Sequence, residues 1–402
     1  MNDVEQTTLR PASDNPWYWL ATVYGEQPIV AYSSSYDEKL AEQNRIAWNR
    51  WKATRLNEDD QFDATERKSF TPEEKLAFLE AFKRRAGSNT LGPPEPAQSI
   101  DFSHNHFERF VCFDRFLFAT VADFKSAMFS RDVRFRGATF SKDAQFNAAM
   151  FSSNVSFVSA TFSEKANFKS STFSESAGFS WVEFRGIADF SSVTFNKNIY
   201  FVNAKFSNKS FLANAVFTTS VPDFDGATLH EGTQWHGVTW PPPPLDKNAA
   251  QTQVYAYERL RREMERLKKY EDEQLFFQKE MGVRRHLYVR WSGPWIVDYL
   301  YEKLSGYGQS LGRPTAWLCV DFWAGFLFFA APDLTGMQMT GPQALRLSFI
   351  NVFSLLLKPI IGGTVDDTLL RPVQIVGATQ SLFGALLLFL LGLALRNRFR
   401  MK

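Results

Sequence analysis

The stretch ATFSEKANFKSSTFSESAGFS, residues 160–180, decides the fold of the central part of the chain. Its phenylalanines stand five or six positions apart, and this spacing continues through twenty consecutive sites from Phe102 to Phe206. The repeating unit of eleven residues therefore holds two large apolar positions. An amphipathic helix of that length would hold about three, and an alternating strand about five or six. Neither regular element explains the pattern.

A chain that turns inward every five or six residues explains it directly. We predict a β-solenoid with four short faces and about 22 residues per turn, in which Phe rings stack along the axis. Alanine or a β-branched residue would fill the other inward position. Adjacent turns would hydrogen-bond at the ~4.8 Å spacing of a sheet, which gives about six turns and a rod roughly 30 Å long. The register changes once near Phe211, and the run ends at PPPP, residues 241–244.

The ADF, ATF, ANF, AGF and AKF units at this spacing resemble the Phe-rich variant of the pentapeptide-repeat proteins. The resemblance implies a mainly β fold, a right-handed quadrilateral β-helix, over residues 101–241. It implies little about activity, because one fold hosts many functions. Some relatives mimic DNA when they engage gyrase, which requires an acidic rod. Residues 102–240 contain twelve acidic and thirteen basic residues, so the charge argues against mimicry.

The segments on either side of the repeats are predicted to be helical. Residues 1–100 form a small N-terminal region whose clearest helix, TPEEKLAFLEAFKRRAG, begins at a capping box of Thr71 and Glu74. Residues 250–312 supply linker helices. Within them, residues 249–281 have an apolar stripe at helical spacing and are predicted to form one long helix. Its stripe would pack on the solenoid or on another subunit.

Composition excludes several classes of protein. The chain has 402 residues with 45 basic and 43 acidic side chains, so it has no overall attraction for nucleic acid. Cys112 and Cys319 form no CxxC pair, and the five histidines lack companions at metal-ligand spacing. The sequence contains no nucleotide-binding or hydrolase motif. We therefore expect no enzyme, no cofactor and no bound metal.

Residues 313–402 have the composition of a transmembrane domain. Residues 314–331 carry one charge, Asp321, and residues 373–395 carry none, so both are candidate spans. Basic residues flank both spans on their outer sides, and the N-terminus has no secretory signal. We expect a bacterial inner-membrane protein with both termini in the cytoplasm. Residues 343–361 are too short and polar for a third span and would re-enter or lie on the membrane.

Two spans cannot enclose a pore, so a channel built from this chain requires a homo-oligomer, for which we expect a tetramer. Polar residues at membrane depth are functional candidates. The pore-lining candidates are Asp321, Asn351, Lys358 and Gln380. The alternatives are interfacial exposure or a hydrogen bond between helices. No TVGYG-like filter is present, so a potassium-selective pore is not predicted.

Basic and aromatic residues gather just before the first span. The ligand-binding candidates are Arg284, Arg285, Arg290, Trp291 and Arg313. In an oligomer they would form a cationic ring that suits a nucleotide or a single-stranded oligodeoxynucleotide. Residues of these types beside a membrane also commonly anchor lipid headgroups, so a contact with the lipid bilayer is the alternative.

Segments outside the repeats extend the resemblance. NPWYWLATVYGEQ, NRIAWNRW, YERLRREMERLKKYEDEQLFF and ALRNRFRMK resemble bacterial membrane-anchored pentapeptide-repeat proteins. The layout of a cytoplasmic domain plus a small channel-like domain resembles the transmembrane effectors of anti-phage defence. In their Hailong B type, oligodeoxyadenylate made by a partner nucleotidyltransferase holds a channel shut. This implies an effector acting through membrane disruption or growth arrest. The alternative is a membrane-tethered scaffold for protein–protein interaction.

Overall fold

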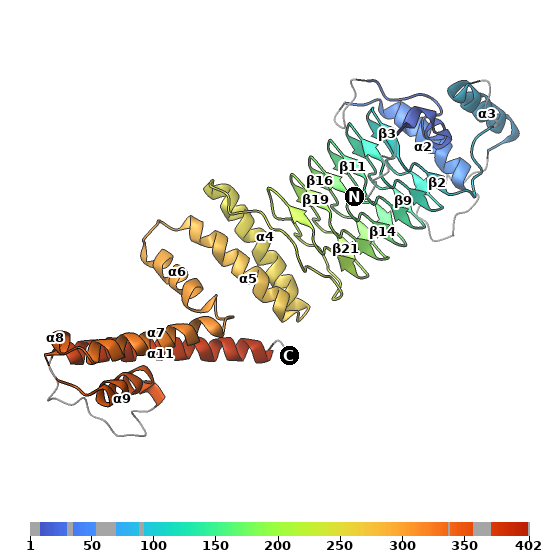
Figure 1. Cartoon of the computed structure of the whole chain (residues 1–402). Coiled ribbons are helices and arrows are strands. Elements are labelled where there is room, and N and C mark those ends of the chain that lie inside the picture. The colour runs from blue at the N-terminus through green and yellow to red at the C-terminus, as the bar shows by residue number, and fades with distance from the viewer. Residues whose placement is uncertain are drawn as a thin grey trace, which may run out of the picture. The chain divides into compact units, whose positions relative to one another are not determined.

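The structure is a computed structural model, and it describes residues 9–29, 35–53, 70–87, 92–336, 338–356 and 371–400. The chain divides into two units, which are described separately (Figure 1). The first comprises residues 1–244 with 252–268 and contains the repeats. The second comprises residues 245–251 with 269–402 and is helical in the part that the structure describes.

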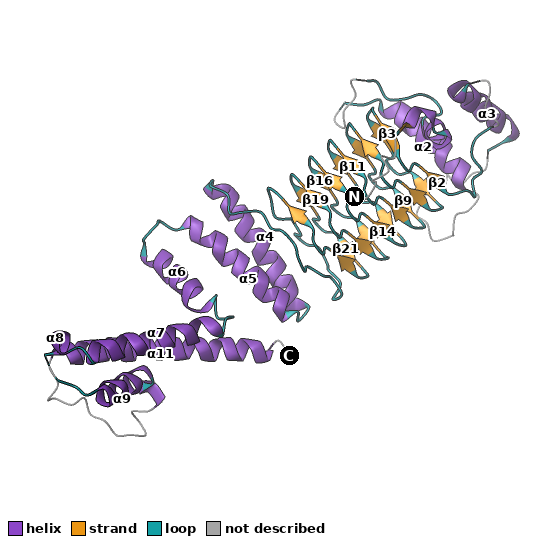
Figure 2. Cartoon of the chain, in the orientation of Figure 1, coloured by secondary structure: helices purple, strands orange, loops and turns teal. Residues whose placement is uncertain are grey.

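The repeats form the predicted solenoid, in which two-residue strands alternate with tight turns (Figure 2). About five turns are built from paired strands, and isolated bridges continue the coil to Thr239. The strands are β1 (Arg10–Pro11), β2 (Ile100–Asp101), β3 (Asn105–Phe107), β4 (Val111–Cys112), β5 (Leu117–Phe118), β6 (Ala122–Asp123), β7 (Met128–Phe129), β8 (Val133–Arg134), β9 (Thr139–Phe140), β10 (Ala144–Gln145), β11 (Met150–Phe151), β12 (Val155–Ser156), β13 (Thr161–Phe162), β14 (Ala166–Asn167), β15 (Thr172–Phe173), β16 (Ala177–Gly178), β17 (Glu183–Phe184), β18 (Ala188–Asp189), β19 (Thr194–Phe195), β20 (Ile199–Tyr200), β21 (Lys205–Phe206), β22 (Ser210–Phe211) and β23 (Val216–Phe217).

Four parallel sheets form the faces of the solenoid, because from β2 to β23 paired strands are four places apart in the chain. Ala144 pairs with Ala166, and Ala166 pairs with Ala188, so the offset between turns is 22 residues. β1 adds a further parallel strand beside β3 at the start of one sheet. The predicted period of the coil is thus confirmed.

The core is a stack of phenylalanine rings, as predicted. Phe140 and Phe162 stack with centroids 4.7 Å apart, and their planes differ by 4°. Rings of neighbouring columns meet edge to face, as Phe146 and Phe157 do at 82°. The twenty ladder positions from Phe102 to Phe206 are all buried, and so are the small residues between them from Ala138 to Ala204. Both arrangements are favoured by the charge distribution of aromatic rings.

The change of register lies later than predicted. Leu212 takes the inward position that follows Phe206 and is buried, whereas Phe211 lies at the outward position of β22 and is only half-buried. Phe217 still pairs with Phe195 at an offset of 22 residues, whereas Asp223 bridges to Tyr200 at an offset of 23. The extra residue therefore enters after Phe217. The prediction of a slip near Phe211 was wrong because it followed residue type rather than inward position.

Helices of the N-terminal region pack on the first turns of the solenoid (Figure 1). They are η1 (Ala12–Asp14), α1 (Pro16–Ala21), α2 (Glu38–Lys52) and α3 (Pro72–Ala86). The capping box of Thr71 and Glu74 is confirmed at the start of α3. From α2, the indole nitrogen of Trp48 donates to the Leu117 carbonyl at 2.8 Å, and the Asn49 amide bonds both the Leu117 N–H and the Arg115 carbonyl. These contacts satisfy backbone groups that the end of a solenoid leaves unpaired.

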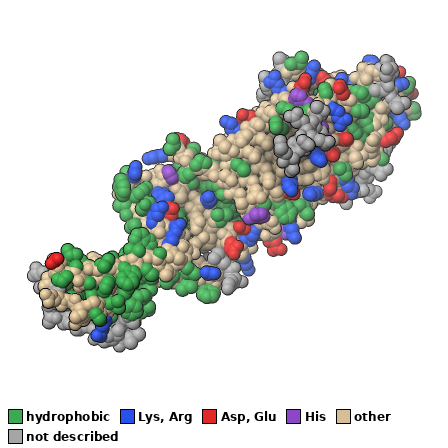
Figure 3. Space-filling model, in the orientation of Figure 1, with side chains coloured by type: hydrophobic (Ala, Val, Ile, Leu, Met, Phe, Trp, Pro, Cys, Tyr) green, Lys and Arg blue, Asp and Glu red, His purple; other side chains and the backbone are tan. Residues whose placement is uncertain are grey.

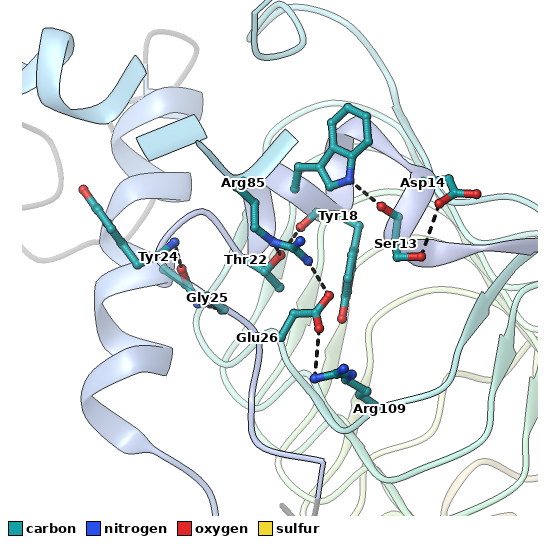
Figure 4. A network of polar contacts seen from close by, with 11 residues as sticks. Ser13, Asp14, Tyr18, Thr22, Tyr24, Gly25, Glu26, Arg85 and Arg109 are labelled. Carbon is teal, nitrogen blue, oxygen red and sulfur yellow. Dashed lines mark hydrogen bonds and ion pairs between the residues drawn. The ribbon is translucent and has the colours of Figure 1, made fainter. Parts of the chain in front are cut away.

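A polar network ties α3 and the loop after α1 to the solenoid (Figure 4). The Glu26 carboxylate pairs with Arg85 of α3 and, at 3.1 Å, with Arg109 of the solenoid. Arg85 also donates to the Thr22 hydroxyl at 3.1 Å. Because Glu26 bridges two cations from separate segments, the network fixes the N-terminal helices on the first turn.

Lys52 at the end of α2 allows a test of this packing. Its side chain is 0% exposed, and its ammonium donates to Pro96 O, Gln98 O and Thr120 Oγ1 at 2.8, 3.3 and 3.0 Å. Lys52→Met leaves these acceptors without that donor, so we expect the free energy of unfolding to fall by about 3 kcal/mol. Chemical denaturation of the full chain measures this. The exposed Lys39→Met on the same helix is the control, and an equal effect of both variants would contradict the prediction.

The last turn of the solenoid is covered by α4 (Lys247–Arg266). Arg259 pairs with Asp223 at 2.8 Å and Asp225 at 3.2 Å, and the Glu263 carboxylate accepts from the Leu229 N–H at 2.9 Å. The single helix predicted over residues 249–281 was wrong. α4 ends at Arg266, Lys268 has a φ of 57°, and α5 (Tyr270–Arg284) begins two residues later.

The second unit consists of α5, η3 (Arg285–Leu287), α6 (Gly293–Ser305), α7 (Gly312–Phe329), α8 (Pro332–Thr335), α9 (Gly341–Val352) and α11 (Arg371–Arg400) in its described part. α7, α9 and α11 pack against one another around Leu318, Val352 and Leu387. Figure 3 shows hydrophobic side chains gathered on the surface of this unit. Most of the charged side chains in this view lie outside the region where the hydrophobic side chains gather.

Among the described residues, one helix is long and apolar enough to cross a membrane, namely residues 372–399 within α11. It contains the second predicted span. The first predicted span forms α7, which is an 18-residue helix that includes Arg313 and Asp321. α9 occupies the start of the segment 343–361, and the end of that segment lies outside the described residues.

Candidate functional site

A cluster of polar side chains lies between α7, α9 and α11. The Gln380 side-chain amide of α11 donates to Ser348 Oγ of α9 at 2.8 Å and to the Asp321 carbonyl of α7 at 3.0 Å. Ser348 Oγ in turn donates to the Phe322 carbonyl at 2.6 Å. Gln380 and Ser348 are both buried. One glutamine therefore connects three helices that also pack against one another through apolar side chains.

Glycines make room for the two amides of the cluster. A Cβ added at Gly325 of α7 would lie 2.1 Å from the Gln380 amide nitrogen. A Cβ added at Gly377 of α11 would lie 3.0 Å from Asn351 of α9. The sequence thus places an amide on one helix opposite a glycine on the next, and close approach of this kind is typical of packed membrane helices.

The cluster also contains buried atoms without partners. Asp321 Oδ2, Gln380 Oε1 and Ser381 Oγ are buried and have no hydrogen-bond partner in the part of the chain that the structure describes. An unpaired polar group in an apolar environment costs free energy, and a carboxylate costs most. These atoms are therefore the places where a buried water or an ion would be accommodated.

Three of the four predicted pore-lining residues meet here: Asp321, Asn351 and Gln380 lie on the facing helices α7, α9 and α11. Lys358 lies outside the described residues. Sequence reasoning missed Ser348, because a helical serine usually bonds its own backbone. Its spacing of three residues from Asn351, on the same helix face, was the available signal.

The predicted ligand-binding arginines are largely paired with acidic or carbonyl groups of the same unit. Arg284 contacts Glu280 at 2.6 Å, and Arg285 contacts Glu302 and, at 3.8 Å, Asp298. Arg313 donates to the Glu302 carbonyl at 2.7 Å.

Asp298 is buried, and this burial raises the pKa of its carboxyl. The nearby Arg285 guanidinium acts in the opposite direction and favours the carboxylate. The arginines of this segment therefore neutralise carboxylates within the unit, which leaves them less able to attract an anion.

Arg290 and Trp291 belong instead to an exposed aromatic row. The rings of Trp291, Trp295 and Tyr299 follow one another at 5.0 and 5.1 Å along the start of α6, and Trp291 is 67% exposed. Arg290 stands 5.8 Å from the Trp291 ring. Amphipathic rings with a flanking cation are typical of a membrane–water interface. This geometry favours the lipid-anchor alternative for these two residues.

Comparison with known proteins bears on the solenoid. Residues 157–204 match the family model described as pentapeptide repeats (9 copies). This part of the solenoid consists of pentapeptide repeats. No curated protein and no solved structure matches the chain significantly. The pentapeptide-repeat fold is typically structural rather than catalytic.

The findings together describe a pentapeptide-repeat scaffold joined in sequence to a helical unit with one helix that could anchor in a membrane.

Burial raises the pKa of the Cys112 thiol of the solenoid to about 12, so this thiol is protonated at neutral pH.

Proposed function

We propose that the chain is a channel-like effector of the bacterial inner membrane, with both termini in the cytoplasm. The observation that carries the proposal is the polar cluster between apolar helices, in which the buried Gln380 bonds the buried Ser348 and the Asp321 carbonyl. An anchor needs only apolar surface, and polar groups at membrane depth are costly unless they serve an ion path or an assembly. α7, the first predicted span, would cross the membrane together with α11.

The channel would be a homo-oligomer, and we expect a tetramer. α7 and α11 expose large apolar side chains on the surface of the isolated unit, which suits contact with lipid or with further copies. On α7 these are Trp317, Val320, Trp323 and Leu327, and on α11 they are Ile375, Leu382, Leu386, Phe389, Leu395 and Phe399. In a ring, opening would have to expose the unpartnered carboxylate oxygen of Asp321, which is buried in the isolated unit.

The gating ligand and the biological role are proposed from the resemblance to Hailong B type effectors. A nucleotide or a single-stranded oligodeoxynucleotide such as oligodeoxyadenylate, made by a partner nucleotidyltransferase, would set the closed or open state. Opening would dissipate ion gradients and arrest growth as an anti-phage defence.

Ion flux from liposomes tests the channel. We expect the purified chain to conduct, and Gln380→Leu to change conductance at least about tenfold, because it removes the amide that joins three helices. Thr379→Val is the matched control, since the Thr379 hydroxyl bonds the Ile375 and Val376 carbonyls of its own helix. The absence of flux in every ligand state would refute the channel.

The second candidate function is a membrane-tethered scaffold for protein–protein interaction. It is favoured by the finding that one described helix, rather than two, has the length and apolarity of a span. The size of the detergent-solubilised protein separates the two candidates. A monomer supports the scaffold, and a symmetric ring supports the channel.

A further inference from the structure

One face of the solenoid has an uneven distribution of outward side chains. The sheet of β4, β8, β12, β16 and β20 presents one outward residue per turn, and the corner that follows presents another with a positive φ. In turn order the sheet residues are Cys112, Arg134, Ser156, Gly178 and Tyr200. The corner residues are Arg115, Gly137, Ser159, Trp181 and Asn203. Arginines thus stand at one end, small residues in the middle and aromatic residues at the other end.

The arginine end forms a cavity of about 490 Å³ between α2 and the first turns. Asp114 is paired with Arg134, and Glu42 lies 3.6 Å from Arg45. The side chains of Arg115 and Arg136 also line the cavity, and both are exposed without an ion pair in the described part of the chain. With Glu38 as the remaining acidic group in the lining, the cavity has a surplus of positive charge.

The middle of the face is a floor of small residues. Gly137, Val158 and Ser159 line the cavity where it meets this floor. A Cβ added at Gly178 would make ordinary contacts with Val158 at 3.5 Å and with Ser156 at 3.9 Å, so only backbone and short side chains surround this position. A ligand lying along the face would therefore meet backbone and short side chains rather than an obstruction.

The aromatic end consists of two exposed side chains, Trp181 and Tyr200, which do not belong to the solenoid core. Trp181 is 63% exposed and has a φ of 59°, a conformation that disfavours bulky residues. In the turns before and after, this corner is occupied by Ser159 and Asn203, which suit it better. Tyr200 is 40% exposed on the adjacent strand column. Large exposed rings at such positions are candidates for stacking on a ligand.

The spacing of the two ends fits an extended anionic ligand with rings. Turns are about 4.8 Å apart, so Trp181 stands roughly 10 Å along the axis from Arg136 and Tyr200 roughly 14 Å. A single phosphate is too small to use both ends, whereas a strand of several nucleotides places phosphates and bases along such a length. Cationic side chains combined with aromatic rings are how proteins bind single strands.

We propose that this arginine–aromatic trough, formed by Arg115, Arg136, Trp181 and Tyr200, binds a short single-stranded oligonucleotide. Phosphates contact the two guanidinium groups, which bind phosphate with two parallel hydrogen bonds each, and bases stack on the two rings. The inference rests on the proposed function only in one respect, namely that the bound ligand would gate the channel. Binding itself requires no channel.

Fluorescence anisotropy of a short fluorescein-labelled oligodeoxyadenylate, added to the full chain in detergent, tests the trough. We expect binding that weakens with salt, and at least tenfold weaker binding to the Arg115→Ala, Arg136→Ala double variant. Trp181→Asn should weaken binding about tenfold while keeping the corner, because asparagine occupies the same corner one turn later. The charge-matched control is the Lys125→Ala, Lys169→Ala double variant, whose exposed lysines follow another sheet.

Three results would overturn the trough: no binding by the unaltered chain, equal binding by the arginine and lysine double variants, or loss of binding only in an Arg284→Ala, Arg285→Ala variant. The last would move the ligand to the juxtamembrane arginines. Flux measurements separate this inference from the channel. Binding at the trough without conductance refutes the channel alone, and conductance without oligonucleotide binding refutes the trough alone.

Discussion

Replacing Phe157 by alanine is expected to lower the free energy of unfolding of the solenoid by about 3–5 kcal/mol. The Phe157 ring is 0% exposed and stacks between Phe135 and Phe179 at 4.8 and 5.0 Å. It also meets Phe146 and Phe168 edge to face at 5.4 and 5.5 Å. Removing it opens a cavity in the middle of the stack, where paired strands on both sides prevent the turns from closing in.

Phe211→Ala is the matched control for this prediction. Phe211 has the same side chain but lies half-buried at the outward position of β22, so we expect a loss below about 1 kcal/mol. Leu212→Ala, which truncates the inward neighbour, should cost about 2–5 kcal/mol. Thermal denaturation of the full chain with hydrogen exchange of β8, β12 and β16 measures the effects. Equal losses in Phe157→Ala and Phe211→Ala would contradict the core assignment.

The solenoid could be predicted because the spacing of its phenylalanines gives the period of the coil. Two inward positions per eleven residues fit neither a helix nor a strand, and the same spacing recurs in every turn. The positions of the corners were not predicted. They recur every eleven residues, before every second inward small residue, as at Ser159 and Trp181, and are occupied by too many residue types to be recognised.

The break between α4 and α5 could not be predicted from apolar spacing. α4 buries Val254, Tyr257, Leu260 and Met264, at intervals of three or four residues. Continuing that stripe would bury residues near 267, 271 and 275, whereas α5 buries Phe276, Glu280 and Val283. One straight helix cannot present both stripes to the same side, and no glycine or proline marks the change.

The candidate sites were predictable to different degrees. Polar residues in an apolar segment are conspicuous, so Asp321, Asn351 and Gln380 were found from the sequence. The pairing of Arg285 with Glu302 joins residues 17 positions apart on separate helices, and no local pattern reveals it. Arg115 and Trp181 lie 66 positions apart, which is three turns of 22, so they share a corner only once the coil is built.

Gly384→Ala in α11 is expected to destabilise the packing of α9 on α11 by about 3 kcal/mol. A Cβ at position 384 would lie 2.3 Å from the Val352 carbonyl oxygen and 3.0 Å from its carbonyl carbon. Both are backbone atoms, so no side-chain rotation relieves the contact and the helices must separate. Because Val352 is buried against Leu387, separation would also expose the core of this unit.

The same helix offers a matched control, Gly392→Ala. Nothing lies within 4 Å of a Cβ at position 392, so this variant adds helix propensity without a clash and should stabilise α11 by up to about 1 kcal/mol. Hydrogen exchange of α9 amides in detergent should therefore accelerate about a hundredfold in Gly384→Ala and remain unchanged in Gly392→Ala. Exchange that is equally slow in both variants would show that α9 does not pack on α11 through Gly384. The placement of Asn351 and Ser348 beside α11 would then be wrong as well, because both lie on α9 together with Val352.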